Sequence, residues 1–561
     1  MWKKGGNKYI KMRVKFCGAV QSVTGSCHLI TIDNHKILLD CGQFQGGKQQ
    51  EALNFMDFPF DPEEIEAVVL SHAHIDHCGR IPLLAKRGFR GNIYCTDATA
   101  DLLEIMLRDS GYIHEKEAEW KNRKNERVGI PLIEPLYTVK EAEESLKLVR
   151  PVLYDQLFEI NESMKACFND AGHILGSAIT ELWVTEGENT SKLVFSGDLG
   201  VKDRPILRDP TVIKKADFLI MESTYGNRLH PKEEGNIEAL MEIVEATAKR
   251  GGTVVIPSFA VGRTQELIYD LAKIYKTDGK YKELLDSLKV YIDSPMATNA
   301  TEIFKNNAQV FDEEAREFLM SGTNPLDFGS LEFTKSTEES QILNEKKEPK
   351  IIISARGMCE AGRIRHHLKH NLWDSRNSIV FVGYQAEGTL GRRLIEGAEE
   401  AVLFGEVIKV QAQIHNLQGF SGHADRDGLF GWLSSFIRRP EQIFLVHGEK
   451  EAKEDFAAYV KENLSLNINV VEDISEFDLE ASKKISIEQA IAHEQDEEFL
   501  DEIKAKIARV HNEMEQILYD ANLHLGESKN PDVISEINNK ILDIEKGVVG
   551  ISSILTQKSD E

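Results

Sequence analysis

A run of nine residues, 71–79, constrains this chain more than any other stretch: it reads Ser-His-Ala-His-Ile-Asp-His-Cys-Gly. It follows an apolar segment that we expect to be a buried strand. In an extended chain His72 and His74 point to the same side. Asp76 and His77 then begin the next turn, so the run can wrap two neighbouring sites. Imidazole and carboxylate are the usual ligands of zinc and similar ions, and four of them this close together indicate a metal site rather than isolated structural histidines.

Length and composition set the class of protein. With 561 residues, of which 41% are hydrophobic and 28% charged, the chain should form two or three globular domains. No apolar run is long enough to cross a membrane, and the N-terminus lacks a signal-peptide pattern. Residues 1–11 read as a tag or an alternative start, so we leave them out of the fold. The seven cysteines are scattered without a C-x-x-C pair, which favours a reducing cytoplasm over disulfides or a thiolate zinc site.

The net charge of −25 is unusual for a protein that binds nucleic acid, because such proteins normally show a basic surface. Net charge is a sum over the whole chain, however, and a cleft can be positive on an acidic protein. Bound metal ions add positive charge that the residue count omits. The charge therefore does not exclude a polyanionic substrate.

Several further ligand-type residues stand where predicted strands end. Asp40 ends an apolar strand near the N-terminus, where we expect short antiparallel strands; it is either a strand-end cap or a carboxylate that supports the histidines. His173 and Asp198 lie beside glycines after later strands, and His447 ends another. His423 lies on a Gly/Ser loop. Each residue taken singly is more often structural, but the repeated strand-end pattern favours ligand roles.

From about residue 214 strands alternate with helices, which indicates a parallel α/β layer. In such sheets ligands bind at the carboxyl ends of the strands. Those ends carry small residues, hydroxyls and arginines, which suit the binding of phosphates by backbone amides and guanidinium groups. Together the loops predict an anionic, polymer-like substrate. The predicted phosphate contacts are Ser258, Arg263, Ser354, Gly357, Thr389, Gly391 and Arg392.

The segment 480–561 differs in kind from the rest. Its apolar residues step by three and four in two blocks, and Gly526 and Pro531 separate the blocks. This pattern predicts two amphipathic helices in an antiparallel hairpin. The hairpin either packs on the body of the protein or mediates dimerisation or partner binding.

With these residues named, the chain resembles the metallo-β-lactamase superfamily and, within it, the β-CASP branch of nucleic-acid-processing nucleases. The likeness covers about residues 12–475 and fits best the bacterial and archaeal relatives of the pre-mRNA 3′-end processing endonuclease, through the segments 255–263 and 383–393. It implies an α/β fold, with an αββα sandwich, an inserted parallel β-CASP domain and the C-terminal helical hairpin. The expected domains are 12–210 and 401–475 for the two parts of the sandwich, 211–400 for the insertion and 480–561 for the helical extension.

The resemblance also implies a set of residue roles. His72, His74 and His173 would bind one metal ion, Asp76, His77 and His447 a second, and Asp198 both. Two Zn²⁺ ions are expected, although Mn²⁺ or iron also suits such nitrogen and oxygen ligands. Asp76 would orient or deprotonate the nucleophile, His423 would act as a general acid, and Glu222 would hydrogen-bond His423. Arg356 departs from the small residue expected in relatives, and it would add a phosphate contact or narrow the groove.

The hypothesis that follows is a two-metal ribonuclease that hydrolyses single-stranded RNA. A histidine at position 447 resembles the RNA-cutting members of the branch. Endonucleolytic cutting is favoured, and a 5′→3′ exonuclease is the alternative. A small-molecule metallo-hydrolase would not need the long α/β insertion, and a non-catalytic RNA-binding subunit would not need every ligand. We expect a cytoplasmic protein with no membrane association, and a homodimer is compatible with the sequence.

Overall fold

The structure is a computed structural model that describes residues 10–186, 189–230, 235–277, 279–322, 324–383, 385, 388–417 and 420–481, all within one compact unit, Met1–Ile485. Two seven-stranded sheets face each other. The first begins antiparallel, as the sequence predicts, and continues with parallel strands. Its strands, in spatial order, are β22 (Ser475–Ala481), β1 (Ile10–Phe16), β2 (His28–Ile32), β3 (His35–Leu39), β4 (Ala67–Val69), β5 (Asn92–Thr96) and β6 (Val149–Val152).

The second sheet supplies the other face of the sandwich. Its strands, in spatial order, are β21 (Ile468–Val470), β20 (Gln442–Leu445), β11 (Phe218–Met221), β10 (Asn189–Phe195), β9 (Ala178–Glu186), β8 (Met164–Asp170) and β7 (Phe158–Asn161). Alternate residues of both sheets point inward and form one apolar core. Fully buried members of this core include Val14, Ile30, Phe168, Leu193 and Phe444.

Helices cover the outer faces of both sheets. The outer face of the first sheet packs against α2 (Ile75–Cys78), α3 (Ile81–Lys86), α4 (Asp97–Val128) and α5 (Val139–Leu146). The second sheet packs against α14 (Arg426–Ser434) and α15 (Lys450–Leu464). Short helices α1 (Lys48–Ala52), η1 (Leu53–Phe55) and η2 (Pro62–Glu64) connect β3 to β4. The expected αββα sandwich is therefore confirmed.

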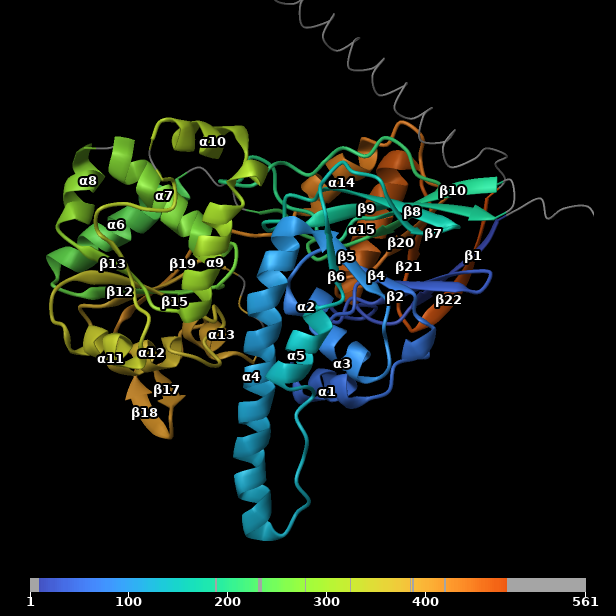
Figure 1. Ribbon diagram of the computed structural model, residues 1–561. Helices are drawn as coiled ribbons and strands as arrows, with labels where there is room; N and C mark the ends of the chain where they lie inside the picture. The colour runs from blue at the N-terminus through green and yellow to red at the C-terminus, as the bar shows by residue number, and fades with distance from the viewer. Residues whose placement is uncertain are drawn as a thin grey trace, which may run out of the picture. The chain divides into compact units, whose positions relative to one another are not determined.

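Helix α4 runs without a break through 32 residues. Gly111 does not interrupt the helix. A side chain at this position would meet the backbone of α5 at Val139, so the glycine permits close packing of the two helices. The helix begins at the side-chain cap of Thr96 and ends at Gly129, whose φ is 68°. In Figure 1, α4 passes between the sandwich and the inserted domain.

The inserted domain is built on a six-stranded, wholly parallel sheet, which confirms the predicted α/β layer. Its strands, in spatial order, are β14 (Leu331–Phe333), β13 (Lys289–Ile292), β15 (Lys350–Ala355), β12 (Thr253–Ser258), β16 (Ser378–Phe381) and β19 (Gln413–Asn416). The helices between them are α6 (Asn236–Lys249), α7 (Arg263–Thr277), α8 (Gly279–Asp286), α9 (Pro295–Asn306), η3 (Ala308–Val310), α10 (Glu313–Met320), α11 (Thr337–Glu345), α12 (Ile364–Asn371) and α13 (Leu390–Ile395). A hairpin of β17 (Glu400–Leu403) and β18 (Glu406–Lys409) follows α13.

Both faces of this sheet are covered, as the alternation along β12 shows. Val254 and Ile256 pack into the cluster that contains residues of α6 and α7, whereas Val255 packs into the cluster of α12 and α13. Strands buried on both faces read as continuous apolar runs. This burial explains why β12 and β15 are nearly uniform in hydrophobicity.

The sheet to which each strand belongs suggests domain boundaries that differ from the expected ones. Strand β11 lies between β10 and β20 of the sandwich, although the expected insertion began at 211. Strand β19 pairs with β16 of the inserted sheet, although the expected insertion ended at 400. We propose that the insertion comprises α6 to β19.

Two further expectations concern other parts of the chain. The predicted helical extension spans 480–561; its first two residues belong to β22, and residues 482–561 lie outside the described residues, as do residues 1–9. Within the described ranges, no helix combines the length and the apolar character that a bilayer-crossing helix needs.

Candidate metal centre

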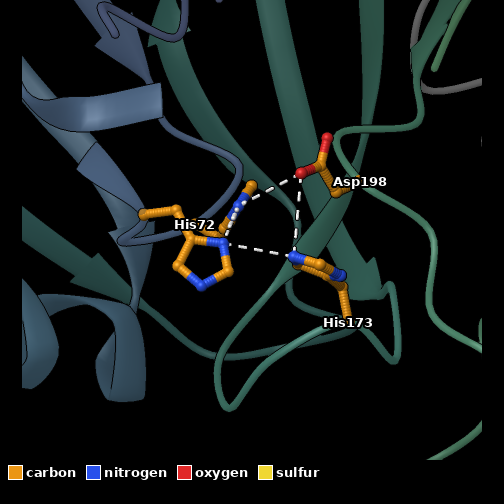
Figure 2. Close-up of side chains that lie close together, drawn as sticks. His72, His173 and Asp198 are labelled. Carbon is orange, nitrogen blue, oxygen red and sulfur yellow. Dashed lines mark hydrogen bonds and ion pairs between the residues drawn. The ribbon is translucent and has the colours of Figure 1, made fainter. Parts of the chain in front are cut away.

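The residues after β4 bring two histidines together with ligands from distant strands. The chain is extended from residue 71 to His74, and the ring atoms His72 Nε2 and His74 Nδ1 lie 3.1 Å apart. His173, from the loop after β8, places its Nε2 3.2 Å from His74 Nδ1. Asp198, from the loop after β10, has its Oδ2 3.6 Å from His72 Nε2 and 3.7 Å from His173 Nε2. Figure 2 shows the imidazoles of His72 and His173 and the carboxylate of Asp198 converging.

A second group adjoins the first. The Nε2 atoms of His77, on α2, and His447, after β20, lie 3.1 Å apart. His447 Nε2 also lies 3.6 Å from Asp76 Oδ2. Asp198 Oδ2 is 3.2 Å from His77 Nε2, and Asp198 Oδ1 is 3.4 Å from His447 Nδ1. Asp198 therefore touches both groups, as a ligand shared between two ions would.

The chemistry of these donors fits a divalent cation. Burial lowers the pKa of His72 and His173 well below the ordinary value, and it lowers the pKa of His74 to about 4, so all three rings are neutral. Neutral imidazole is the form that binds metal. His74 Nδ1 faces two ring nitrogens, and one hydrogen cannot satisfy all three atoms. Asp198 Oδ1 is buried and has no hydrogen-bond donor among the described residues, so a bound cation would compensate the cost of burying this oxygen.

Asp40 supports this centre from behind. Its Oδ2 accepts hydrogen bonds from His77 Nδ1 (2.7 Å), Ser26 Oγ (2.9 Å) and Ser71 Oγ (3.0 Å), and its Oδ1 accepts from Ser71 N (2.8 Å). A proton held on Nδ1 of His77 leaves Nε2 free as the ligand atom. Asp40 and His447 both have left-handed backbone conformations, with φ of 61° and 48°. Such strained positions concentrate at functional sites.

His423 and Glu222 form a pair beside the metal ligands. The Nδ1 atom of His423 lies 3.3 Å from Glu222 Oε1, and Glu222 Oε1 also accepts from Leu199 N at 2.6 Å. Burial disfavours the charged imidazole, but the carboxylates of Glu222 and Asp198 outweigh it and raise the pKa of His423 to about 9. The ring is therefore protonated at neutral pH, with Nδ1 committed to Glu222 and Nε2 left for another acceptor.

Two glycines, which the sequence reasoning missed, bring the supporting strands up to the ligands. A side chain at Gly42 would overlap the carbonyl of Asp76, and one at Gly200 would overlap the carbonyl of Gly172 and crowd the amide of His173. Backbone hydrogen bonds from residues 41 and 43 to the carbonyls of residues 77 and 75 hold the first contact. The signal was present, since Asp-x-Gly occurs after both strands.

The predicted phosphate contacts divide into buried and accessible residues. Ser258 Oγ accepts from Thr264 Oγ1 (3.1 Å), and Ser354 Oγ donates to the carbonyl of Asp293 (3.0 Å). A side chain at Gly391 would overlap Gln385, so that glycine serves packing.

Thr389 and Arg392 are partly exposed, whereas Gly357 is buried. Thr389 caps α13 by accepting from the amide of Arg392 at 3.3 Å. Arg392 Nε donates to Glu396 at 2.6 Å. Direct contact of these residues with phosphate remains a prediction.

Arg263 has a different setting from the one predicted. It is buried, and its guanidinium pairs with Glu266 and donates to the carbonyl of Phe420 at 2.5 Å. Glu266 also pairs with Arg204 of the sandwich at 2.5 Å, and Arg204 donates to the carbonyl of Ser421. This buried group of Arg204, Arg263 and Glu266, here called the arginine triad, holds the loop that precedes His423. We propose that Arg263 positions this loop.

Arg356 lies at the carboxyl end of β15 with a left-handed φ of 79°. Its Nη2 is 3.5 Å from Asp109 of α4, so the pair links the inserted domain to the sandwich. Both side chains are partly exposed, and a phosphate could compete for the guanidinium.

Three family profiles match the chain: the metallo-beta-lactamase superfamily over residues 22–147, the Beta-Casp domain over 264–394, and the Zn-dependent metallo-hydrolase RNA specificity domain over 407–471. The chain is 39% identical over 440 residues to Ribonuclease TTHA0252 of Thermus thermophilus, which covers 78% of this chain and 94% of that protein. It is 34% identical over 461 residues to Transcription termination factor FttA of Methanocaldococcus jannaschii (80% and 69%). Identity to FttA of Methanosarcina mazei is 33% over 478 residues (82% and 71%).

Proposed function

Because the chain belongs to the β-CASP metallo-hydrolases of the metallo-β-lactamase superfamily, we propose that it is a metal-dependent ribonuclease that hydrolyses phosphodiester bonds of single-stranded RNA. One observation carries this proposal: two adjoining groups of buried nitrogen and oxygen ligands share Asp198. The RNA specificity profile covers the segment that contains His423 and His447, and a similar protein is named a ribonuclease. These points favour RNA over a small-molecule substrate.

The proposed cofactor is a pair of Zn²⁺ ions, with Mn²⁺ or iron as alternatives that suit the same ligands. His72, His74 and His173 would hold one ion, Asp76, His77 and His447 the other, and Asp198 both. When bound, the ions supply Lewis acidity and neutralise the charge that develops on the phosphate. The absence of cysteine from the ligand groups agrees with a catalytic rather than a structural zinc site.

The chain's own residues would handle the protons. Asp76 has the most exposed carboxylate of the centre, at 19%, so it can orient the attacking water or accept its proton. His423 would donate the proton on Nε2 to the leaving oxygen, since Glu222 occupies Nδ1 and favours the imidazolium form. Asp40 would keep His77 in the tautomer that leaves Nε2 free.

The test of the metal centre uses substitutions with a matched control. Asp76→Ala and His77→Ala should abolish cleavage and lower the metal content, while RNA binding remains detectable. His35→Ala removes a histidine that pairs with Glu66 at the surface, away from the centre, and should leave cleavage unchanged. Cleavage at the wild-type rate by both centre variants would refute the assignment.

The general-acid role has a separate test. His423→Ala should slow cleavage most for RNAs with a poor leaving group, because those depend most on protonation of the leaving oxygen. RNAs with an activated leaving group serve as the internal control. An equal loss for every leaving group would argue that His423 does not donate this proton.

Endonucleolytic cutting is the proposed mode. RNAs labelled at one end, with blocked or free 5′ ends, distinguish it from 5′→3′ exonucleolytic digestion. Internal fragments from both RNAs are expected, whereas mononucleotide release that needs a free 5′ end would establish the exonuclease.

A homodimer and a cytoplasmic location are further proposals. Sedimentation of the full chain, with and without residues 482–561, tests whether the predicted hairpin mediates dimerisation. None of the seven cysteines forms a disulfide in the structure, which supports a reducing compartment.

A further inference from the structure

An exposed aromatic ring stands at the carboxyl end of β12. Phe259 directly follows this fully buried strand, yet its side chain is 43% exposed. Its backbone is held in place, because its carbonyl accepts from Thr264 Oγ1 at 2.6 Å. The ring is therefore presented to solvent by a rigid main chain rather than by a loose loop.

Two glycines keep this ring uncovered. Strand β12 lies between β15 and β16, so the loops after all three strands emerge side by side. A Cβ atom at Gly357 would lie 3.4 Å from Phe259 Cε2, and one at Gly383 would lie 3.8 Å from the same atom. Any larger residue at these positions would pack over the ring. The sequence thus places a large aromatic between two residues that cannot shield it.

The ring also lies on the side of the inserted sheet that faces the candidate metal centre. The loop that begins with Phe259 continues to Gly262, where a Cβ would touch Ile174 at 3.4 Å, and Ile174 directly follows His173. Arg263, at the end of the same loop, bonds the carbonyl of Phe420, three residues before His423. The loop that Phe259 begins therefore reaches the segments that carry both a proposed ligand and the proposed acid.

Charge in the neighbourhood suits a polyanion. Arg356 directly precedes Gly357, is exposed, and adopts a left-handed backbone conformation. Its guanidinium lies 3.5 Å from Asp109, which is the upper limit of hydrogen-bonding distance. The interaction is therefore weak, and a phosphate can compete with that carboxylate. An exposed ring beside an exposed arginine is the combination that binds single-stranded nucleic acid.

We propose that Phe259 is a nucleobase-stacking residue, on which one base of the bound RNA lies near the cleavage site. This proposal rests on the proposed ribonuclease function and names a contact of the same site. Stacking uses the face that every base presents, so it would hold the strand without selecting a base. It would also compensate for the acidic net charge, because stacking does not depend on a basic surface.

The test is a binding cycle on the full chain. The probes are single-stranded RNAs with hydrolysis-resistant phosphorothioate linkages, each lacking one base at a different position. For the wild type we expect the loss of one particular base to weaken binding by about 5- to 150-fold, the range for base–aromatic stacking. Phe259→Ala should weaken binding of intact RNA by the same factor and lose no further affinity when that base is absent. Phe259→Tyr keeps an aromatic face and should resemble the wild type.

Phe404→Ala is the matched control, because Phe404 is 48% exposed in the turn between β17 and β18, away from the loops after β12, β15 and β16. Phe404→Ala should change neither the affinity for intact RNA nor the affinity for RNA that lacks the base. Metal content is measured for every variant, and equal values show that the metal centre is intact.

The outcomes separate the two proposals. If Phe259→Ala and the missing base weaken binding independently, or if Phe404→Ala has the same effect, stacking is overturned even where the wild type cuts ordinary RNA. If the wild type shows the coupling but does not cut, stacking stands and the ribonuclease function falls. A wild type that neither binds nor cuts RNA overturns both.

Discussion

Replacing Glu266 with glutamine tests how the inserted domain supports the loop that precedes His423. Glu266 pairs with Arg263 of its own helix α7 and with Arg204 of the sandwich, and the side chains of Arg204 and Glu266 are 3% and 4% exposed. Both arginines also donate to carbonyls of the loop that precedes His423. Glutamine keeps the size of the side chain but removes its charge, so Glu266→Gln removes the carboxylate with which both buried guanidinium groups pair.

The magnitude follows from this burial. Breaking a buried ion pair from one side costs about 3–5 kcal/mol, because the remaining charge stays desolvated. Here two guanidinium groups share one carboxylate, so we expect a cost of at least about 3 kcal/mol, the lower end of this range. We expect this cost to appear as opening of the loop that precedes His423, because both arginines hold that loop. Gly422, in that loop, accepts a hydrogen bond from His173 Nδ1 at 3.0 Å, so opening disturbs the metal centre as well.

Hydrogen exchange measures the effect where it is expected. The amide of Ala424 donates to the carbonyl of Leu199 at 2.8 Å and is protected while the loop is closed. A local loss of about 3 kcal/mol should speed its exchange by about 100-fold, and RNA cleavage should fall with it.

Glu314→Gln is the control, because Glu314 of α10 pairs with Lys273 of α7 at an exposed position, where such a pair contributes about 1 kcal/mol or less. Exchange at Ala424 that is as slow in Glu266→Gln as in Glu314→Gln would refute the reasoning.

Three further predictions follow from single positions. Gly42→Ala should abolish metal binding and cleavage, because its Cβ would overlap the carbonyl of Asp76, whereas Gly47→Ala, with nothing within 4 Å, should leave both unchanged. Burial raises the pKa of Asp270 to about 7, so its contribution to stability is complete below about pH 4 and is lost as the pH rises through 7. Asp270→Asn should therefore raise the urea midpoint relative to the wild type more at pH 8 than at pH 5; a constant difference would contradict this. Arg356→Gly suits a φ of 79° and should raise the urea midpoint, yet it should weaken RNA binding and lower its salt dependence by about one ion; unchanged binding would exclude a phosphate contact.

Patterns within a few residues predicted much of the fold. The apolar runs before His72 and before Asp198 indicated strands, and β4 and β10 lie there. Strand–helix alternation indicated a parallel sheet, and all six strands of the inserted sheet are parallel. The domain boundaries were less predictable, because the sheet to which β11 or β19 belongs depends on the strands that pair with it. That pairing depends on strands far away in the chain.

The candidate site divides in the same way. The types of ligand and their order along the chain are local properties, so His72, His74, Asp76 and His77 could be singled out before any contact was known. Their meeting with His447 could not, since 370 residues separate the two imidazoles that lie 3.1 Å apart. The resemblance to the β-CASP branch supplied that expectation, and packing of β20 beside β11 brings the ring there.

Other features were decided only by tertiary structure. Arg263 has the charge of a phosphate ligand, but burial against Glu266 commits its guanidinium to the protein. Phe259 has the large apolar side chain that is typical of a core residue, but Gly357 and Gly383 leave its ring exposed. The sequence by itself determined which chemistry is present, because residue type and local period act over a few residues. The tertiary structure decided which groups are available for that chemistry, because burial and partners depend on what the rest of the chain places beside them.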